Sequence, residues 1–173
     1  MDPEFAQTHG LVRDYLRWVL RASGPAPEPG RAARALRSAA ASAQREVERR
    51  LPRALAGLRV ASPDAARAAF DRVMAREFED GVLNWGRIVT VLAFSGVLVK
   101  KLPAEQRAAG AGADPVSLFV AEFLMRVAGD WMRRNGGWEN GFLKKFETKS
   151  CWLTFLEVTG QLFEMFSLLK QYY

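Results

Sequence analysis

Four residues, Asn84-Trp85-Gly86-Arg87, stand directly before the only strongly apolar run of the chain, Ile88 to Val99. The asparagine suits the N-cap of a helix, because its side-chain oxygen can accept a hydrogen bond from an unpaired amide of the first turn. The arginine then lies in that first turn, where the helix dipole disfavours a cation, and beside a segment with almost no polar residues. A charge placed against both preferences indicates an anionic partner. These residues alone leave open whether that partner belongs to the protein or to a ligand.

Residues suited to catalysis are sparse. His9 is the only histidine, and a His-based triad or a metal site with several histidines would have to be built around it. We expect it on the surface or in a loop. Cys151 is the only cysteine and has no obvious base near it in the sequence, so a structural role is the simpler interpretation.

Two further patterns resemble catalytic or phosphate-binding sequences only superficially. Gly136-Gly137 lacks the spacing and the preceding strand of a phosphate-binding loop. Glu77, Glu79 and Asp80 cluster at a predicted helix end, and a solvated turn explains them. The sequence therefore predicts no catalytic residue, no metal site and no cofactor, and we expect the protein not to be an enzyme.

Length and composition suit one globular domain. The chain has 173 residues, of which 49% are hydrophobic, so it can bury a sizeable core. The net charge of +6 permits nucleic acid, anionic lipid or acidic proteins as partners and chooses among none of them. A single cysteine favours a reducing compartment, and no signal peptide is visible. The apolar run 88–99 is shorter than the roughly 20 residues of a membrane-spanning helix.

The apolar periodicity is helical nearly throughout, and no segment alternates as a strand does. Ser62-Pro63-Asp64 is a clear helix start, and Pro52 should end or kink the helix before it. The expected helices lie near residues 11–19, 36–51, 62–78, 84–101, 114–134, 138–146 and 150–169. The predicted fold is all-α, a globular bundle of about eight helices around one central apolar helix.

We expect residues 1–149 to form the helical core, with loops over 22–30 and 103–113. Residues 150–173 should form an amphipathic helix that belongs to the same domain or associates with a membrane. Its polar stripe consists of Thr154, Glu157, Gln161, Glu164 and Gln171.

Two segments resemble homology motifs of the Bcl-2 family of apoptosis regulators. Phe78 to Arg87 is similar to the first motif of that family, and Trp131 to Glu139 is similar to the second. Leu11 to Leu20 resembles the fourth motif, and Leu36 to Val47 occupies the place of the third. The resemblance covers nearly the whole chain and implies a Bcl-2-like fold.

The resemblance also implies a function. Survival members of the family hold a hydrophobic groove that captures an amphipathic helix, the BH-3 segment, of a pro-apoptotic family member. The chain is thus expected to be an anti-apoptotic regulator that sequesters BH-3 helices and multidomain pro-apoptotic members. It would restrain mitochondrial outer-membrane permeabilisation, from the cytoplasm and from the cytosolic face of that membrane.

The resemblance places particular residues around this groove. Val47, Leu51 and Ala54 would line one side, Phe70, Val73 and Met74 the floor and other wall, and Thr90 and Phe94 the base. Glu77 would lie at the rim, facing basic residues of some partners, and Asn84 would add a polar contact. Arg87 would pair with an aspartate of the partner, and Gly86 would allow close approach. Without the resemblance, Phe70, Val73, Met74 and Phe94 at helical spacing would simply indicate a core.

Two positions depart from the family pattern. Ala41 stands about where many relatives carry an acidic residue in the third motif, so this helix is a poor donor of a death motif and the receptor role is favoured. Ala54 stands about where some relatives carry a cysteine, so no covalent handle is expected in the groove.

Two other functions remain open. A pore-forming or membrane-remodelling protein of the same fold would suit a central apolar helix and a positive net charge. A basic helical nucleic-acid binder would use Arg45, Arg49, Arg50 and Arg53, but no recognised binding motif accompanies them, and we expect no nucleic-acid partner.

Overall fold

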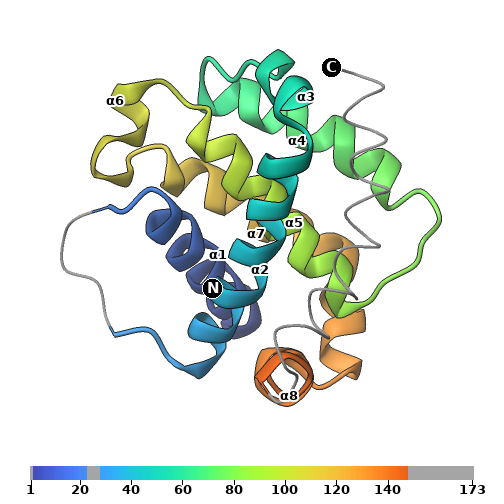
Figure 1. Ribbon diagram of the computed structural model, residues 1–173. Helices are drawn as coiled ribbons and strands as arrows, with labels where there is room; N and C mark the ends of the chain where they lie inside the picture. The colour runs from blue at the N-terminus through green and yellow to red at the C-terminus, as the bar shows by residue number, and fades with distance from the viewer. Residues whose placement is uncertain (1, 23–27, 148–173) are drawn as a thin grey trace.

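The computed structural model describes residues 2–22 and 28–147 (Figure 1). Every regular element in these two ranges is helical, which confirms the all-α prediction. The α-helices are α1 (Pro3–Val19), α2 (Arg31–Arg50), α3 (Pro52–Gly57), α4 (Pro63–Glu77), α5 (Trp85–Lys100), α6 (Ala104–Arg107), α7 (Ala113–Arg134) and α8 (Leu143–Glu147). A 3-10 turn, η1 (Ala108–Gly110), and a π-helical turn, η2 (Gly137–Phe142), complete them. The final helix predicted over 150–173 lies outside the described residues.

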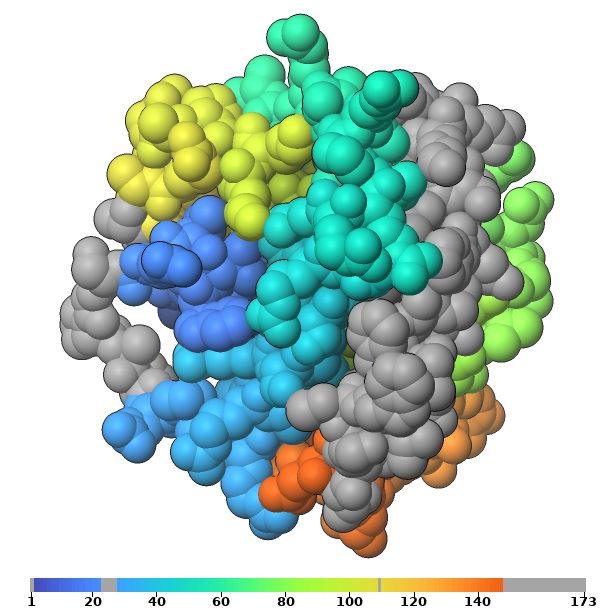
Figure 2. Space-filling view, in the orientation of Figure 1, coloured from blue at the N-terminus to red at the C-terminus, as the bar shows by residue number. Residues whose placement is uncertain are grey.

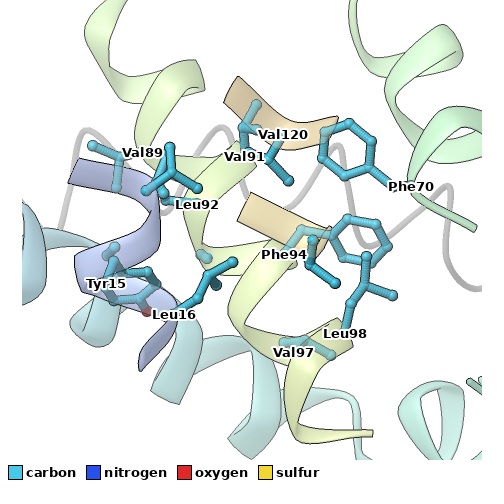
Figure 3. Packing of buried hydrophobic residues seen from close by; sticks show 14 of the residues in the cluster. Tyr15, Leu16, Phe70, Val89, Val91, Leu92, Phe94, Val97, Leu98 and Val120 are labelled. Carbon is cyan, nitrogen blue, oxygen red and sulfur yellow. The ribbon is translucent and has the colours of Figure 1, made fainter. Parts of the chain in front are cut away.

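Helix α5 is the central helix, as predicted. Every residue from Trp85 to Val99 is buried, and the helix contacts α1, α2, α4 and α7. Figure 3 shows its apolar side chains among those of the surrounding helices, including Leu16, Phe70 and Val120. No helix within the described part of the chain, α5 included, has the length and hydropathy needed to cross a membrane.

Helix α1 begins earlier than predicted. The Asp2 carboxylate accepts a hydrogen bond from the Glu4 amide at 3.1 Å, and Pro3 suits the first helical position. His9 therefore lies inside a helix and not in a loop. Its Nε2 atom is 3.2 Å from Oγ of Ser117 in α7, so the histidine belongs to a packed helix pair.

Prolines and caps divide the next part of the chain as the sequence predicts. Helix α2 ends at Arg50, and α3 begins with Pro52, whose missing amide proton cannot continue the preceding helix. Ser62 caps α4, because its Oγ accepts from the Ala65 amide at 3.1 Å. The predicted helix start at Ser62-Pro63 is therefore confirmed.

Residues 103–113, predicted as a loop, contain α6 and η1 instead. The Arg107 Nε atom donates to the Leu102 carbonyl at 2.9 Å, and the Gly112 amide donates to the Gln106 carbonyl at 2.6 Å. A Cβ atom at Gly112 would lie 2.5 Å from Leu102 Cδ1. The small residues of this segment thus permit close packing, a reason for glycine that sequence alone does not separate from flexibility.

The end of α7 also differs in detail from the prediction. The helix stops at Arg134, and Gly136 adopts a left-handed φ of 92°. The single short helix expected over 138–146 is instead η2 followed directly by α8. Left-handed backbone at Gly136 redirects the chain, so the residues that follow pack back onto the bundle.

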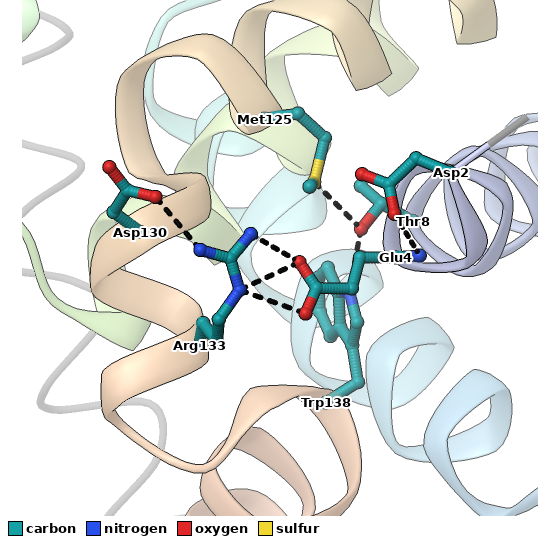
Figure 4. Close-up of polar contacts among 7 residues, drawn as sticks. All are labelled: Asp2, Glu4, Thr8, Met125, Asp130, Arg133 and Trp138. Carbon is teal, nitrogen blue, oxygen red and sulfur yellow. Dashed lines mark hydrogen bonds and ion pairs between the residues drawn. The ribbon is translucent and has the colours of Figure 1, made fainter.

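Polar contacts join the start of α1 to α7 and η2 (Figure 4). Trp138 Nε1 donates to Thr8 Oγ1 at 3.0 Å, and that hydroxyl lies 3.4 Å from the sulfur of Met125, to which it donates. Arg133 and Glu4 form an exposed ion pair with a closest distance of 2.6 Å. These contacts hold the N-terminal helix against segments more than a hundred residues away.

Candidate functional site

The Arg87 guanidinium lies at the corner between α4 and α5. Its Nη1 and Nη2 atoms donate to the two carboxylate oxygens of Asp80 at 2.6 and 2.7 Å. Nη1 also donates to the carbonyl oxygens of Glu77 at 2.9 Å and Val82 at 3.2 Å. The Arg87 side chain is only 5% exposed, so its charge is largely removed from water. The anionic partner that the sequence predicts for Arg87 is thus a carboxylate of the same chain.

The helix ends explain why a cation is stable here. Asn84 caps α5 as predicted, accepting from the Arg87 amide at 2.8 Å through Oδ1. Arg87 opposes the dipole of α5, but Glu77 is the last residue of α4 and its carbonyl belongs to the negative end of that helix. The guanidinium therefore complements one helix while it opposes the other.

Asp80, which the sequence predicts in a solvated turn, is a functional candidate. Its side chain is 51% exposed, yet it holds Arg87 and accepts from the Val82 amide at 3.0 Å. Hydrogen bonds from Arg87, and then from Val82, lower the pKa of Asp80. Gly81, with φ of 70°, turns the chain between the acid and α5. A carboxylate seven residues before Arg87, across a glycine turn, was the signal available in the sequence.

The predicted apolar groove residues come from α2, α3, α4, α5 and the junction between α2 and α3. All of them belong to one continuous hydrophobic cluster, and all are buried: Val47, Leu51, Ala54, Phe70, Val73, Met74 and Phe94. Gly86 and Thr90 are buried in α5, and the Thr90 hydroxyl donates to the Arg87 carbonyl at 2.6 Å. That hydroxyl is therefore satisfied within its own helix.

One predicted site residue, Glu77, lies differently from the expectation. Glu77 is 4% exposed and not at a rim. It follows Phe70, Val73 and Met74 at helical spacing, so it lies on the same inward face of α4. Phe70 packs against α7, with its ring centroid 5.4 Å from that of Phe119.

Aromatic packing joins the two homology-like segments. The Trp85 ring centroid lies 5.1 Å from that of Trp131, 5.6 Å from that of Trp138 and 5.9 Å from that of Phe142. A Cβ atom at Gly141 would lie 2.8 Å from Trp85 Cζ2. The first turn of α5 is therefore buried by the second segment and by the residues directly after it, and this packing positions the residues around Arg87.

Comparisons with known proteins agree with this arrangement. The family model described as apoptosis regulator proteins, Bcl-2 family, matches residues 36–138, which include both segments. The chain belongs to the Bcl-2 family. It is 52% identical over 173 residues to Bcl-2-related protein A1 of Bos taurus, covering 99% of each chain. It is 36% identical over 140 residues to anti-apoptotic protein NR13 of Coturnix japonica, covering 81% of this chain and 76% of the relative.

Similarity extends to a third named Bcl-2 family relative. Apoptosis regulator Bcl-2 of Canis lupus familiaris is 32% identical over 145 residues, which cover 79% of this chain and 60% of the relative. The family membership confirms the resemblance stated from the motifs.

Two of the basic residues near the end of α2 share one acidic partner. Arg49 pairs with Glu46 at 2.7 Å, and Arg50 pairs with the same carboxylate. The pKa of Glu46 is lowered, first by its hydrogen bond from Arg49. Two of the four arginines that suggested nucleic-acid binding are thus engaged in ion pairs. Over residues 2–22 and 28–147, no group of three or more His, Cys, Asp and Glu side chains is placed to hold a metal ion.

Proposed function

We propose that this chain is an anti-apoptotic regulator that binds the amphipathic BH-3 helices of pro-apoptotic Bcl-2 family proteins. Membership of the family and the name of the Coturnix japonica relative support this role. The observation that carries it is Arg87, a nearly buried cation held at the edge of a large apolar cluster. An amphipathic helix that carries apolar anchors and one aspartate complements both features.

In this proposal the partner helix lies over α5, between α2 and α3 on one side and α4 on the other. Its anchors, at spacings i, i+3 or i+4, i+7 and i+11, contact Val47, Leu51, Val73 and Met74, which are buried in this structure and become accessible as the partner binds. Burial of four such anchors contributes roughly 1.5–3 kcal/mol each before the costs of association. A nanomolar complex requires about −12 kcal/mol, so apolar burial together with one ion pair is of the required size.

The ion pair between Asp80 and Arg87 sets the terms on which a partner aspartate binds. Asp80 is half exposed, so its carboxylate can turn into water when another carboxylate approaches. Arg87 also donates to the carbonyls of Glu77 and Val82. These are backbone groups, so they do not compete with a carboxylate of the partner. The partner aspartate therefore replaces or shares Asp80 while the guanidinium keeps its position.

Fluorescence polarisation with a labelled BH-3 peptide tests the proposal on the whole chain. We expect nanomolar binding, and a loss of roughly a hundredfold in Arg87→Ala, because truncating one member of a desolvated pair costs a few kcal/mol. Arg134→Ala removes an exposed arginine at the end of α7 and should bind as the original chain does. A peptide without its aspartate should bind Arg87→Ala and the original chain equally. Thermal melts verify that each variant is folded, and a folded protein that binds no BH-3 peptide refutes the proposal.

The proposed cellular role is restraint of mitochondrial outer-membrane permeabilisation, exerted from the cytoplasm and from the cytosolic face of that membrane. Multidomain pro-apoptotic members are proposed partners through their own BH-3 helices. Contact with the membrane is assigned in this proposal to residues 150–173, whose sequence is amphipathic. Release of a dye from liposomes by a pro-apoptotic effector, with and without this chain, measures the restraint.

The second candidate is a pore-forming or membrane-remodelling protein, and the apolar character of α5 favours it. The liposome assay separates the two candidates. Leakage caused by this chain alone supports the second candidate, whereas suppression of leakage caused by an effector supports the first.

A further inference from the structure

A cleft of about 790 Å³ lies between α1 and α2, among residues that the proposed function does not use. Its walls come from residues 10–22 of α1 and the turn after it and from residues 37–48 of α2, with Lys100 from the end of α5. Figure 2 shows α1 in dark blue beside the lighter blue and teal of α2. The helical parts of the two walls, residues 10–19 and 37–48, are about 15 and about 18 Å long at 1.5 Å per residue, and the volume is that of a small-molecule site.

The lining of this cleft is strongly basic, with six basic residues and two acidic ones. Both acids are already paired: Asp14 accepts two hydrogen bonds from Arg37, at 2.6 and 2.9 Å, and Glu48 accepts one from Lys100 at 2.9 Å. No acidic residue of the lining is therefore left to neutralise its other basic residues.

Arg13 of the lining pairs with Asp114, outside the cleft, at 2.7 Å, so three other guanidinium groups carry the remaining positive charge. Within residues 2–22 and 28–147, they make no ion pair with a carboxylate: Arg17, Arg21 and Arg45. Arginine presents a planar fork of donors that matches phosphate oxygens bidentately, so three such groups around one cleft favour a phosphate-rich anion.

The base of the cleft is an ordered polar network. The Tyr15 hydroxyl donates to Gln44 Oε1 at 2.6 Å, and Gln44 Nε2 donates to Glu48 Oε1 at 3.0 Å. Tyr15 is fully buried, and burial, followed by the nearby charge of Glu48, raises its pKa, so the phenol stays a neutral donor. Because Gln44 is 4% exposed and held at both ends of its amide, the network is fixed before any ligand arrives.

An exposed aromatic ring completes the lining. The Trp18 side chain is 42% exposed although most large hydrophobic side chains of the described residues are buried. Arg37 lies over its ring at 5.6 Å from the centroid, and the Tyr15 ring is 6.1 Å away. An indole held in this way offers a stacking surface for a planar base.

We propose that the α1–α2 cleft binds a nucleoside polyphosphate, with the phosphates on Arg17, Arg21 and Arg45 and the base against Trp18. The positive charge of the lining favours the phosphate groups of this ligand, and the exposed indole of Trp18 favours its base. A volume of about 790 Å³ suits a mononucleotide better than a polymer. The cleft lies on α1 and α2 and shares none of the residues assigned to the BH-3 groove.

Isothermal titration of the whole chain with ATP, inorganic tripolyphosphate and adenosine tests this assignment. ATP should bind with one-to-one stoichiometry, and affinity should fall as salt rises. Tripolyphosphate should bind at least about fivefold more weakly than ATP, because it lacks the stacked base, and adenosine should not bind measurably. The variant Trp18→Leu should reduce ATP affinity to that of tripolyphosphate and leave tripolyphosphate affinity unchanged.

Charge variants identify the site of binding. Arg17→Gln with Arg45→Gln should weaken ATP at least about tenfold, because two charge-assisted contacts are lost. Arg59→Gln with Arg134→Gln removes the same charge from exposed arginines outside the cleft and should leave ATP affinity unchanged. Arg17→Lys with Arg45→Lys keeps the charge and should bind with intermediate affinity; melts verify folding.

Three results would overturn the proposal. The first is the absence of saturable ATP binding by the folded chain. The second is an equal loss in both glutamine pairs, which indicates only a general attraction to positive charge. The third is equal affinity for ATP and tripolyphosphate together with no effect of Trp18→Leu on either. That result would show that the base is not recognised.

Discussion

Asp80 and Arg87 form a bidentate ion pair across the turn that joins α4 to α5, and the two partners differ in their exposure to water. The Asp80 side chain is 51% exposed, whereas the Arg87 side chain is 5% exposed. Loss of the acid therefore leaves a buried guanidinium that still contacts two backbone carbonyls. Loss of the base leaves only a solvated carboxylate and an emptied position at the helix corner.

Replacement of Asp80 by asparagine should strengthen binding of a BH-3 peptide that carries its aspartate. In the original chain the partner aspartate competes with Asp80 for Arg87, and Asp80→Asn weakens the competitor without removing the cation. Fluorescence polarisation should show a lower Kd for this variant. A peptide with alanine in place of aspartate provides the control, since its affinity should not change. Unchanged affinity for both peptides would contradict competition at Arg87.

The stability difference between the original chain and Asp80→Asn should depend on pH. The pKa of Asp80 is lowered, chiefly by the hydrogen bonds from Arg87. The ionised Asp80 carboxylate therefore contributes fully to the free energy of unfolding at pH values well above its pKa in the unfolded chain, about 3.9. This contribution is lost as pH falls through the pKa of Asp80 in the folded protein. Thermal melts should show the original chain as the more stable above roughly pH 5, with the difference fading at lower pH. Glu4 and Glu46 are present in both proteins, so their effects on stability cancel in the comparison. A stability difference that stays constant with pH would contradict the assignment of the pH dependence to Asp80.

Substitution by alanine should change the stability of the protein differently at two helical glycines. A Cβ atom at Gly96 would collide with Gln44 Oε1, which is held by Tyr15 and cannot move cheaply. Gly96→Ala should destabilise the protein by about 1–3 kcal/mol, as overpacking does. The nearest atom to a Cβ at Gly129 is the flexible Met125 methyl at 3.4 Å, so Gly129→Ala should be neutral or stabilise by up to about 1 kcal/mol. Urea unfolding measures both, and equal effects would refute the packing argument.

The hydrogen bond from Trp138 to Thr8 should couple η2 to α1 energetically. Trp138→Phe and Thr8→Val each remove one partner of a buried contact of 3.0 Å. A double-mutant cycle from urea unfolding should give a coupling of about 0.5–1.5 kcal/mol, the usual net value of such a bond. Strictly additive losses would show that the two residues stabilise the protein separately.

Local chemistry was readable from the sequence where one short segment contains all the participants. The caps at Ser62 and Asn84 involve residues three positions apart, and both were predicted correctly. Asp2-Pro3-Glu4 has the same order of cap, proline and acid as Ser62-Pro63-Asp64, but it precedes a less apolar segment, so apolar periodicity does not mark it as a helix start. The apolar face of α4 was also predictable, because helical spacing specifies it.

The partner of Arg87 was not predictable in the same way. Glu77, Glu79 and Asp80 are all within ten residues of it, and only the path of the chain through Gly81 selects Asp80. Glu77 has a place on the inward face of α4 by helical spacing, whereas the family resemblance placed it at the rim of the groove. For Arg87, the three-dimensional path of the turn, which depends on the packing of α4 against α5, determines which of three acidic residues becomes its partner.

The two carbonyl contacts of Arg87 have a consequence for any carboxylate that reaches it. A long arginine side chain normally loses about 2 kcal/mol of rotamer entropy when one conformation is selected. Here the carbonyls of Glu77 and Val82 select that conformation as the chain folds. An incoming carboxylate therefore meets a donor fork that is already aimed, and the ordering of this side chain is absent from the free energy of association.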